Sequence, residues 1–228
     1  MTTTTLGYED LPRLMSLMTG DEKHSPAATS TLDVVWTLYD QILDVDPADP
    51  DHPDLDRFYL SKGHGPMAFY AVLAVKGFIG VEELPHWAGY ESHLGWHPDR
   101  VLIPGVEIGS GSLGHGLGMA VGAALALDAR GQEGARVVCL LGDGELDEGS
   151  NHEAIAFAAR AGLDRLTAIV IDNQSARHGW PGGVHRRFAV EGLGTSTVNG
   201  RDHAALREAL TTVKDGRPHA VVAVVERR

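Results

Sequence analysis

Two short polar turns follow two apolar runs, and their side chains carry the oxygen atoms that a metal ion needs. The first run, residues 136–141, ends in GDG at 142–144, and the second, residues 167–172, ends in Asn173. The alanine-rich stretch between the runs has the composition of a helix, which predicts a strand–helix–strand unit with parallel strands. Because the carboxyl ends of neighbouring parallel strands open at one edge of a sheet, Asp143 and Asn173 are expected to lie close together.

A carboxylate, an amide oxygen and a main-chain carbonyl, for which Ser175 is the candidate, form a donor set suited to Mg²⁺ or Ca²⁺. A single protein carboxylate leaves the ion with positive charge for further oxygen ligands, such as those of a phosphate. Gly142 and Gly144 lack the side chains that would keep a diphosphate away from the backbone. GDG alone is more typical of a turn, but the asparagine at the end of the next strand favours a site. The spacing therefore predicts a divalent metal that carries a diphosphate.

The charge balance disfavours a protein that binds the phosphate backbone of nucleic acids. The 19 basic and 31 acidic residues give a net charge of -12, whereas nucleic-acid binding depends on clustered lysine and arginine. No apolar run reaches the ~20 residues of a membrane-spanning helix, and the first residues lack the basic and apolar regions of a secretory signal. The lone Cys139 lies inside an apolar run, which predicts an inert core residue. We expect a cytoplasmic enzyme or binding protein with no nucleic-acid or membrane partner.

The other elements predict one α/β domain over residues 1–228, with a mainly parallel sheet and helices on both faces. The patterns indicate an irregular arm or poorly marked helix at 1–28, helices at 31–43, 66–77, 112–131, 151–161 and 201–216, and strands at 57–60, 136–141, 167–172 and 219–226. Ser112 is a candidate cap for its helix, and Ser150 with Glu153 matches a capping box. Gly162 is expected to end the helix that this box begins.

Four glycines interrupt the helix predicted at 112–131, namely Gly114, Gly116, Gly118 and Gly122. Each costs about 1 kcal/mol relative to alanine in a helix interior. A helix that tolerates them indicates very close packing against its backbone. The neighbour is another helix, a partner subunit or a ligand, and the pattern alone does not choose among them.

Several motifs in one order then identify a family. The stretch "GDGELDEG…IVIDN" resembles the thiamine diphosphate signature, and "LLGDGELDEGSNHEA" resembles its transketolase branch. The resemblance continues at "LSKGHGPMAFYAVLAVKGF", at "HLGWHPDRVLIPGVEIGSGSLGHGLGMAVGAALA" and more loosely at "KHSPAATSTLDVVWTLY". These motifs cover most of the chain, which therefore resembles the diphosphate-binding half of a transketolase.

This resemblance implies a role for each matching residue. Mg²⁺, for which Ca²⁺ can substitute, would be bound by Asp143, Asn173 and the carbonyl of Ser175. Thiamine diphosphate would be contacted by these ligands and their neighbours: Gly111, Ser112, Leu113, Gly142, Asp143, Gly144, Glu145 and Asn173. Three histidines match those that line the substrate channel, and a glutamate matches one that links two active sites across a subunit interface: His24, His64, His97 and Glu148.

Two of these histidines also have a physical case. His64 directly precedes a predicted helix start, where free N–H groups favour an oxyanion. His97 lies in a loop rich in proline and glycine, where functional side chains are common. Imidazole groups in such places can donate to a substrate hydroxyl or carbonyl.

The family's activity implies a transfer in which the thiazolium carbon of the cofactor attacks a ketose, often a phosphate, and passes a two-carbon ketol unit to an acceptor. A complete transketolase also has a pyrimidine-binding domain, and "AVVAVVERR" matches the region where the link to it begins. We therefore expect a split enzyme, active only with a separate C-terminal subunit in an α2β2 assembly. Two alternatives stay open. One is a component resembling the first enzyme of a 2-oxo acid dehydrogenase, which passes an acyl unit to a lipoyl or acyl carrier protein. The other is a non-catalytic scaffold subunit.

The sequence departs from the family pattern at three places that bear on the substrate. Trp96 stands where glycine is usual before the channel histidine, and it either narrows the entrance or packs against the partner. His115 replaces a usual glutamine, and "NQSARHGWPGG" differs from the usual continuation after Asn173. These departures indicate a specialised route outside central sugar metabolism, in which the two-carbon unit passes from a small-molecule substrate to another acceptor or to an acyl carrier.

Overall fold

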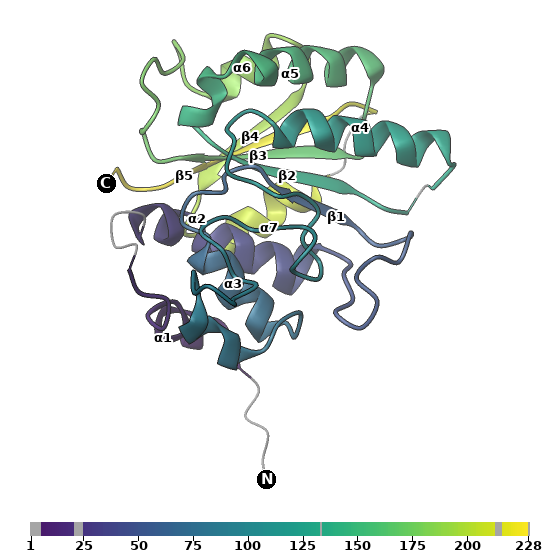
Figure 1. The fold of residues 1–228 in the computed structure, drawn as a ribbon. Helices are drawn as coiled ribbons and strands as arrows, with labels where there is room; N and C mark the ends of the chain where they lie inside the picture. The colour runs from purple at the N-terminus through teal and green to yellow at the C-terminus, as the bar shows by residue number, and fades with distance from the viewer. Residues whose placement is uncertain (1–5, 21–24, 133, 213–215, 228) are drawn as a thin grey trace.

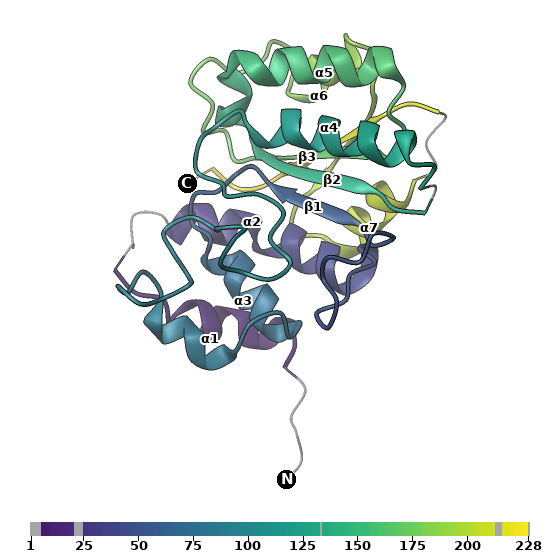
Figure 2. The ribbon, with the colours of Figure 1, turned by 45° about the vertical axis from the view of Figure 1, so that its right-hand side comes forward.

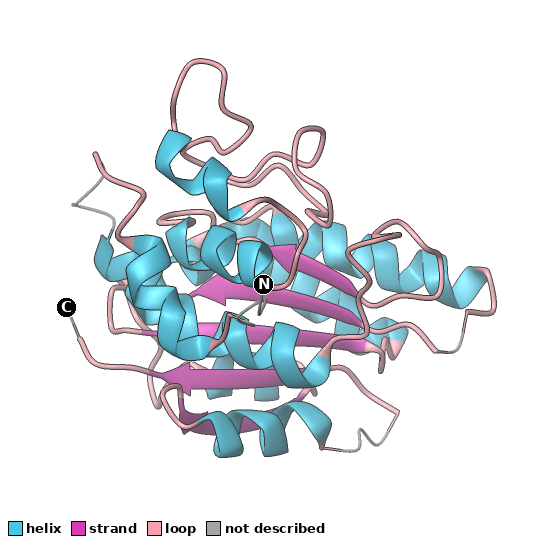
Figure 3. Ribbon diagram, turned by 90° about the horizontal axis from the view of Figure 1, so that it is seen from below, coloured by secondary structure: helices cyan, strands magenta, loops and turns pink. Residues whose placement is uncertain are grey.

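A single parallel sheet of five strands organises the chain in the computed structural model, which describes residues 6–20, 25–132, 134–212 and 216–227. The strand order is β1-β2-β3-β5-β4, and every pair is parallel (Figures 1 and 3). The strands are β1 (Arg57–Leu60), β2 (Val137–Gly142), β3 (Leu166–Asp172), β4 (Gly194–Asn199) and β5 (His219–Val224). The predicted parallel sheet is therefore confirmed.

Helices cover both faces of this sheet, as predicted (Figures 1 and 2). One face carries α4 (Gly116–Ala129), α5 (Gly149–Ala161) and α6 (His185–Ala189). The other face carries α1 (Leu11–Met15), α2 (Ser25–Thr37), α3 (Met67–Val75) and α7 (His203–Thr211). Three short segments of the described residues are 3-10 helices: η1 (Tyr8–Asp10), η4 (Val81–His86) and η5 (Gly144–Asp147). One short segment that follows α2 is a π-helix, η3 (Leu38–Ile42).

The central strands are buried on both faces because they separate two apolar cores. Alternate residues of β2 point to opposite sides. Val138 and Leu140 enter the core on the α2–α3 side, whereas Val137 and Leu141 enter the core beneath α4 and α5. Cys139 lies in the second core and is fully buried, and this burial raises the pKa of its thiol and makes it harder to ionise. Burial on both sides explains why β2 and β3 are near-continuous apolar runs in the sequence.

The helix predicted at 31–43 begins earlier, at Ser25, and ends in the wide turn of η3. Its first half is rich in serine and threonine, which masks the apolar period. These hydroxyls bond back to carbonyls in the preceding turn, as Thr31 Oγ1 does to the Ala27 carbonyl at 2.9 Å. The helix thus satisfies its polar side chains locally, an arrangement that a search for apolar periodicity does not detect.

Both predicted serine caps are wrong. Gly111 and Gly114 have φ angles of 128° and 84°, so the chain is not helical there and α4 begins only at Gly116. The hydroxyl of Ser150 is inside α5 and donates to the Gly114 carbonyl at 2.7 Å instead of capping its own helix. The end of α5 is as predicted, since Gly162 adopts a left-handed φ of 64°.

Two elements, β4 and α6, have no counterpart among the predicted ones. Strand β4 reads GTSTVN and stays partly exposed at the edge of the sheet, so it shows no apolar run. Helix α6 is only five residues long. Within the described part of the chain, no helix combines the length and the apolar character needed to cross a membrane.

Candidate functional site

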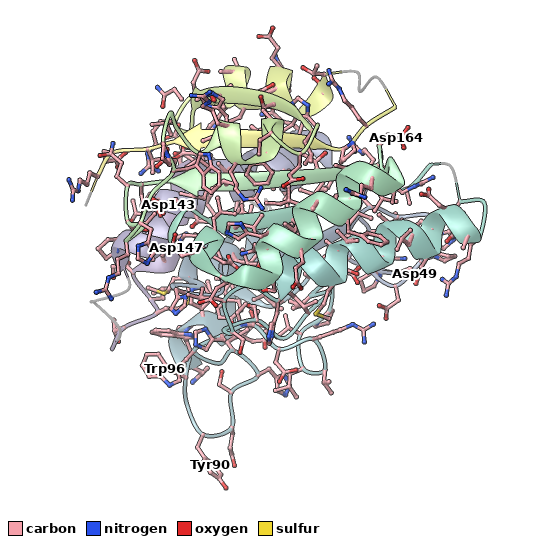
Figure 4. The ribbon with its side chains drawn as sticks, turned by 90° about the horizontal axis from the view of Figure 1, so that it is seen from above. Asp49, Tyr90, Trp96, Asp143, Asp147 and Asp164 are labelled. Carbon is pink, nitrogen blue, oxygen red and sulfur yellow. The ribbon has the colours of Figure 1, made fainter. Side chains whose placement is uncertain are left out.

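Asp143 lies at the carboxyl end of β2, beside the end of β3. The register pairs Gly142 with Ile171, and the Asp143 N–H donates to the Ile171 carbonyl at 3.0 Å. The side chain of Asp143 is buried at only 2% exposure. Figure 4 shows it near Asp147. The strand–helix–strand unit therefore places this carboxylate at the sheet edge, as the sequence predicts.

The loop after β3 wraps around this carboxylate. Asp143 Oδ1 accepts from the Gly144 N–H at 2.9 Å and from the Ser175 hydroxyl at 2.6 Å. Asp143 Oδ2 accepts from the main-chain N–H groups of Ser175 at 2.7 Å and Ala176 at 3.0 Å. Three of these four donors come from the loop after β3, so Asp143 joins the ends of the two strands.

Asn173 is connected to Asp143 through a donor that the two side chains share. The Ser175 N–H that bonds Asp143 also donates to Asn173 Oδ1 at 3.2 Å. The turn that returns Ser175 to this position requires Gln174 to adopt a φ of 58°, a left-handed conformation that costs energy in a residue with a side chain. The three residues predicted as metal ligands are thus brought together, and their role as ligands remains a prediction.

The oxygen atoms of these residues are suited to binding a hard divalent cation together with a diphosphate. Among the described residues, no group of three or more His, Cys, Asp or Glu side chains could hold a metal, so any ion here must also use amide, main-chain or ligand oxygens. A Cβ built on Gly142 would lie 3.5 Å from the Lys62 side chain, and one on Gly144 would lie 3.6 Å from Ser175, both ordinary contacts. The protein alone therefore does not require glycine at either position, and the absence of a side chain leaves the backbone there accessible to a group such as a diphosphate.

Glu145, predicted to contact the cofactor, has its carboxylate directed into the protein. Its Oε1 accepts from the Ser61 hydroxyl and from the Gly114 N–H, the latter at 2.9 Å, and its Oε2 accepts from the Gly142 N–H at 3.3 Å. Burial raises the pKa of this carboxyl, although these hydrogen bonds and Lys62 act in the opposite direction. We call Ser61, Gly114, Gly142 and Glu145 the Glu145 hub. The hub joins the end of β1, the loop before α4 and the end of β2.

Lys62 is a buried cation beside this hub that sequence reasoning missed. Its Nζ donates to the Ala27 carbonyl and to the Thr31 hydroxyl, each at 2.9 Å. Burial lowers the pKa of Lys62 to about 8, while the charges of Asp143 and Glu145 oppose that shift. The only signal in the sequence is its place in "SKGHG". That signal does not reveal that the side chain runs inward toward α2.

The two described histidines of the predicted channel lie together. The rings of His64 and His97 are 5.5 Å apart and nearly perpendicular. His97 Nδ1 lies 3.0 Å from the Gly63 carbonyl, which can only accept, so the proton is on Nδ1. A Cβ on Gly111 would lie 2.9 Å from the His97 ring, so this position needs glycine for steric reasons as well as for its φ of 128°. The third predicted histidine, His24, lies outside the described residues.

The loop before α4 carries the other residues predicted to contact the cofactor rings. Ser112 and Leu113 are exposed there, and Gly111 packs so close to the loop at Gly63 that a Cβ on Gly63 would lie 2.8 Å from the Gly111 nitrogen. The neighbouring Ser110 Oγ is buried and has no hydrogen-bond partner among the described groups. A buried orphan hydroxyl at this place is a further polar group that a ligand could satisfy, and no motif in the sequence selects it.

Glu148, Trp96 and His115 are exposed around this region. Glu148 precedes the first residue of α5, and its Cβ and Cγ lie close to Gly114. His115 directly precedes α4, and its side chain makes no capping hydrogen bond. The Trp96 ring packs on Trp87 at 4.8 Å, and Figure 4 shows Trp96 on the same side of the molecule as Asp143.

Comparisons with known proteins agree with this geometry. Residues 16–225 match the family "Transketolase, thiamine diphosphate binding domain". The chain is 55% identical over 225 residues to "Ferredoxin fas2" of Rhodococcoides fascians, covering 74% of that protein. It is 35% identical over 207 residues to one subunit of the apulose-4-phosphate transketolase of Actinobacillus succinogenes, covering 75% of that polypeptide. It is 37% identical to "Transketolase 2" of Xanthobacter flavus but spans only 31% of that protein.

Solved structures show the same relationship. The fold matches transketolase from Leishmania mexicana with a TM-score of 0.77 at 25% identity, and transketolase from Campylobacter jejuni with a TM-score of 0.78 at 26% identity. The match covers 96% and 95% of this chain, but only 37% of each solved chain. The chain therefore belongs to the transketolase family, and it corresponds to the thiamine diphosphate binding domain at the N-terminal end of those enzymes.

Proposed function

We propose that this chain is the diphosphate-binding subunit of a two-component transketolase-like enzyme, which moves a two-carbon ketol unit from a ketose phosphate to an acceptor. The observation that carries this proposal is the convergence of Asp143, Asn173 and Ser175 at two adjoining strand ends. This arrangement supports a site for Mg²⁺, with Ca²⁺ as a substitute, and for the diphosphate of thiamine diphosphate. When bound, the cofactor supplies a nucleophilic carbon and an electron sink.

The chain's own residues would bind and orient that cofactor. Asp143, Asn173 and the Ser175 carbonyl would hold the metal, and the absence of side chains at Gly142 and Gly144 would let the diphosphate reach the backbone. Lys62, buried beside Asp143, would add positive charge next to the phosphates. No interaction of this kind needs a basic surface, in keeping with the net charge of -12.

The histidine pair would act on the substrate. His97 donates its Nδ1 proton to the Gly63 carbonyl, so its Nε2 is the ring atom available to a substrate oxygen. His64 stands nearly perpendicular to it, just before the start of α3. Together they can hold a substrate hydroxyl and move a proton to or from a carbonyl oxygen. His24 would join them if the family's arrangement holds here.

The other half of the active site would come from a second polypeptide carrying the pyrimidine-binding domain. Two findings support this part of the proposal. The relative that is one subunit of an apulose-4-phosphate transketolase is matched over 75% of its length, whereas the chain spans about a third of the longer transketolases. An α2β2 complex with Glu148 at its interface would complete two sites.

The name of the relative that is 55% identical, "Ferredoxin fas2", does not transfer to this chain. Iron–sulfur clusters of ferredoxins are held by several cysteine thiolates. This chain has a single cysteine, and Cys139 is buried in the core beneath α4 and α5. These 228 residues therefore lack the set of cysteines that would hold such a cluster.

The test is native mass spectrometry of the protein with its partner, combined with a ketol-transfer assay. Asp143→Asn is expected to lower cofactor and Mg²⁺ affinity by about 100-fold or more, because it removes the charged ligand. Asp164→Asn is the matched control, since Asp164 is an exposed aspartate beyond α5 (Figure 4). Ketose phosphates compared with 2-oxo acids as donors then separate ketol transfer from acyl transfer. Equal cofactor content and equal activity in the two variants would contradict the proposal.

A further inference from the structure

The segment that follows Asn173 is fixed at its inner end and again, by a different set of contacts, at its outer end. Its inner end is the pair Ser175 and Ala176, whose N–H groups donate to Asp143. Its outer end is Trp180, which begins a tight turn: the Gly183 N–H donates to the Trp180 carbonyl at 3.0 Å. Proline follows Trp180, and Gly182 has a φ of 84°, which together are typical of a type II turn. The segment is therefore a closed loop with two anchors.

The outer anchor is the side chain of Arg187 on α6. The Arg187 guanidinium carbon lies 5.2 Å from the centre of the Trp180 ring, in the geometry of a cation–π contact. Arg187 is only 4% exposed, and its Nη1 also lies 3.4 Å from Glu191 Oε1. A buried guanidinium is costly unless it is well partnered. Arg187 is held in one place by these contacts, so it can serve as a rigid support for the indole.

A third contact of Arg187, with His152, connects it to the η5 turn after Asp143. Arg187 Nε donates to His152 Nδ1 at 3.0 Å, and His152 Nε2 lies 3.1 Å from the Leu146 carbonyl. Arginine only donates, so Nδ1 must accept, and the proton of the neutral ring is on Nε2, which donates to Leu146. Leu146 belongs to η5, the turn that starts directly after Asp143. The Trp180 loop and the Asp143 turn are thus tied to the same arginine.

The middle of the loop adds a contact to the same turn. The His178 N–H lies 3.4 Å from Asp147 Oδ2, and Asp147 is the last residue of η5. The loop at 174–183 is therefore connected to Asp143 directly, to Asp147 through His178, and to Leu146 indirectly through Arg187 and His152. These contacts connect the loop to the η5 turn at more than one point.

We propose that Trp180, packed on Arg187, is a positioning residue that keeps residues 174–183 closed over Asp143 and thereby holds Asn173 and Ser175 in place for the metal. This inference rests on the proposed function for its metal, but the closed loop is a property of the chain itself. Trp180 is 38% exposed, so its removal opens the loop without emptying the core. It does not touch the reacting atoms, and its effect passes through the position of the loop.

The experiment compares Trp180→Ala with Trp180→Phe in the full 228-residue chain. Tyr90→Ala is the matched control, because Tyr90 is a fully exposed aromatic residue in a different loop (Figure 4). Two quantities are measured: hydrogen exchange of the Ser175 and Ala176 amides, and the Kd for Mn²⁺ in the presence of thiamine diphosphate. In Trp180→Ala we expect exchange of these amides and the Kd to rise by about tenfold each, the order for loss of one partly desolvated cation–π contact. Phenylalanine keeps an aromatic face, so Trp180→Phe should stay within about threefold of the wild type.

The outcomes separate the two proposals. Unchanged exchange at Ser175 and Ala176 in Trp180→Ala would overturn the role of Trp180. Faster exchange throughout the chain would also overturn it, because it would indicate general destabilisation instead of local opening. If the wild-type chain and its complex do not bind Mn²⁺ with thiamine diphosphate, the proposed function fails. The exchange data still decide whether Trp180 closes the loop in that case.

Discussion

The glycines before and within α4 fall into two groups with different surroundings. Gly114 and Gly116 form the first half of this segment, and Gly118 and Gly122 form the second. A Cβ on Gly116 would lie 2.3 Å from the Cβ of Ser61, and one on Gly114 would lie 2.5 Å from the Ser150 hydroxyl. Gly118 and Gly122 lie further along the same helix, and a Cβ on either would meet no described atom within 4 Å. The first half is packed against the protein, and the second half faces outward.

This difference shows that a run of glycines need not have one explanation. The first half lies where the Glu145 hub draws the chain together: the Gly114 N–H donates to Glu145, and the Gly116 N–H donates to the Ser61 hydroxyl at 3.0 Å. The second half belongs to an outward face with several exposed apolar side chains, namely Met119, Leu125 and Phe157. Figure 4 looks onto this side of the molecule, with α4 and α5 toward the viewer. The first half is thus packed against the Glu145 hub, and the second half leaves the helix backbone open to a neighbour such as the proposed partner subunits.

The largest effect is expected from a methyl group added to the packed half. Gly116→Ala would force Ser61 away from the helix and break its hydrogen bonds within the Glu145 hub, destabilising the chain by about 3 kcal/mol. Gly118→Ala, two residues further on, is the matched control and is expected to stabilise the isolated chain by about 0.5–1 kcal/mol. Urea unfolding of the two variants measures both values. Similar values for the two would show that the halves do not differ.

A somewhat smaller effect is expected from Lys62, the buried cation beside the packed half. Below pH 8 this lysine is protonated in the folded and unfolded chains, and the folded chain bears the full cost of its burial. Between pH 8 and 10 the unfolded chain retains a proton that the folded chain has lost, so the free energy of unfolding should rise with pH, by about 2–3 kcal/mol.

Lys62→Met should lack this rise. The free energy of unfolding of the wild type minus that of the variant, taken at each pH, therefore gives the contribution of Lys62. Chemical unfolding at a series of pH values from about 7 to 10 provides the measurement. Stopping near pH 10 limits the contribution of Tyr8 and Tyr59, whose pKa values burial raises to about 12. A difference that stays flat across the range would mean that water reaches Lys62 in the folded chain.

The smallest effect, and one that changes sign with context, is expected at Gly122. In the isolated chain Gly122→Ala should add about 0.5–1 kcal/mol of stability, because alanine has the higher helix propensity and no described atom is displaced. In the proposed assembly the same methyl group would hold the backbone away from a partner and weaken the complex. The complex should therefore dissociate at a higher protein concentration than the wild type does. Native mass spectrometry over a dilution series detects this, with Glu153→Ala as an exposed variant on α5 for comparison. A complex unaffected by the methyl group would place the partner elsewhere.

The elements and residues that could be predicted are those whose signals are local. The strand–helix–strand unit needs only two apolar runs and the helix between them, so the meeting of Asp143 and Asn173 followed from spacing alone. The unpredicted features depend on residues far apart in the chain. Ser61 and Glu145, which are hydrogen-bonded, are separated by 84 positions. Ser150 does not form the predicted capping box, because its hydroxyl donates to the Gly114 carbonyl 36 positions away. Tertiary hydrogen bonds of this kind override local propensity, and no short motif records them.

The Glu145 hub has a consequence for how the chain folds. Its members lie on segments that are separated by tens of residues, and the carboxylate can collect its donors only after β1 and β2 have paired. Bringing such distant segments together costs loop-closure entropy before any contact is made, so we expect the hub to form only when most of the sheet is in place. A ligand that binds the finished site therefore selects the fully folded chain and stabilises it by mass action. In the cell, the lifetime of this protein against proteolysis would then depend on the concentration of its cofactor.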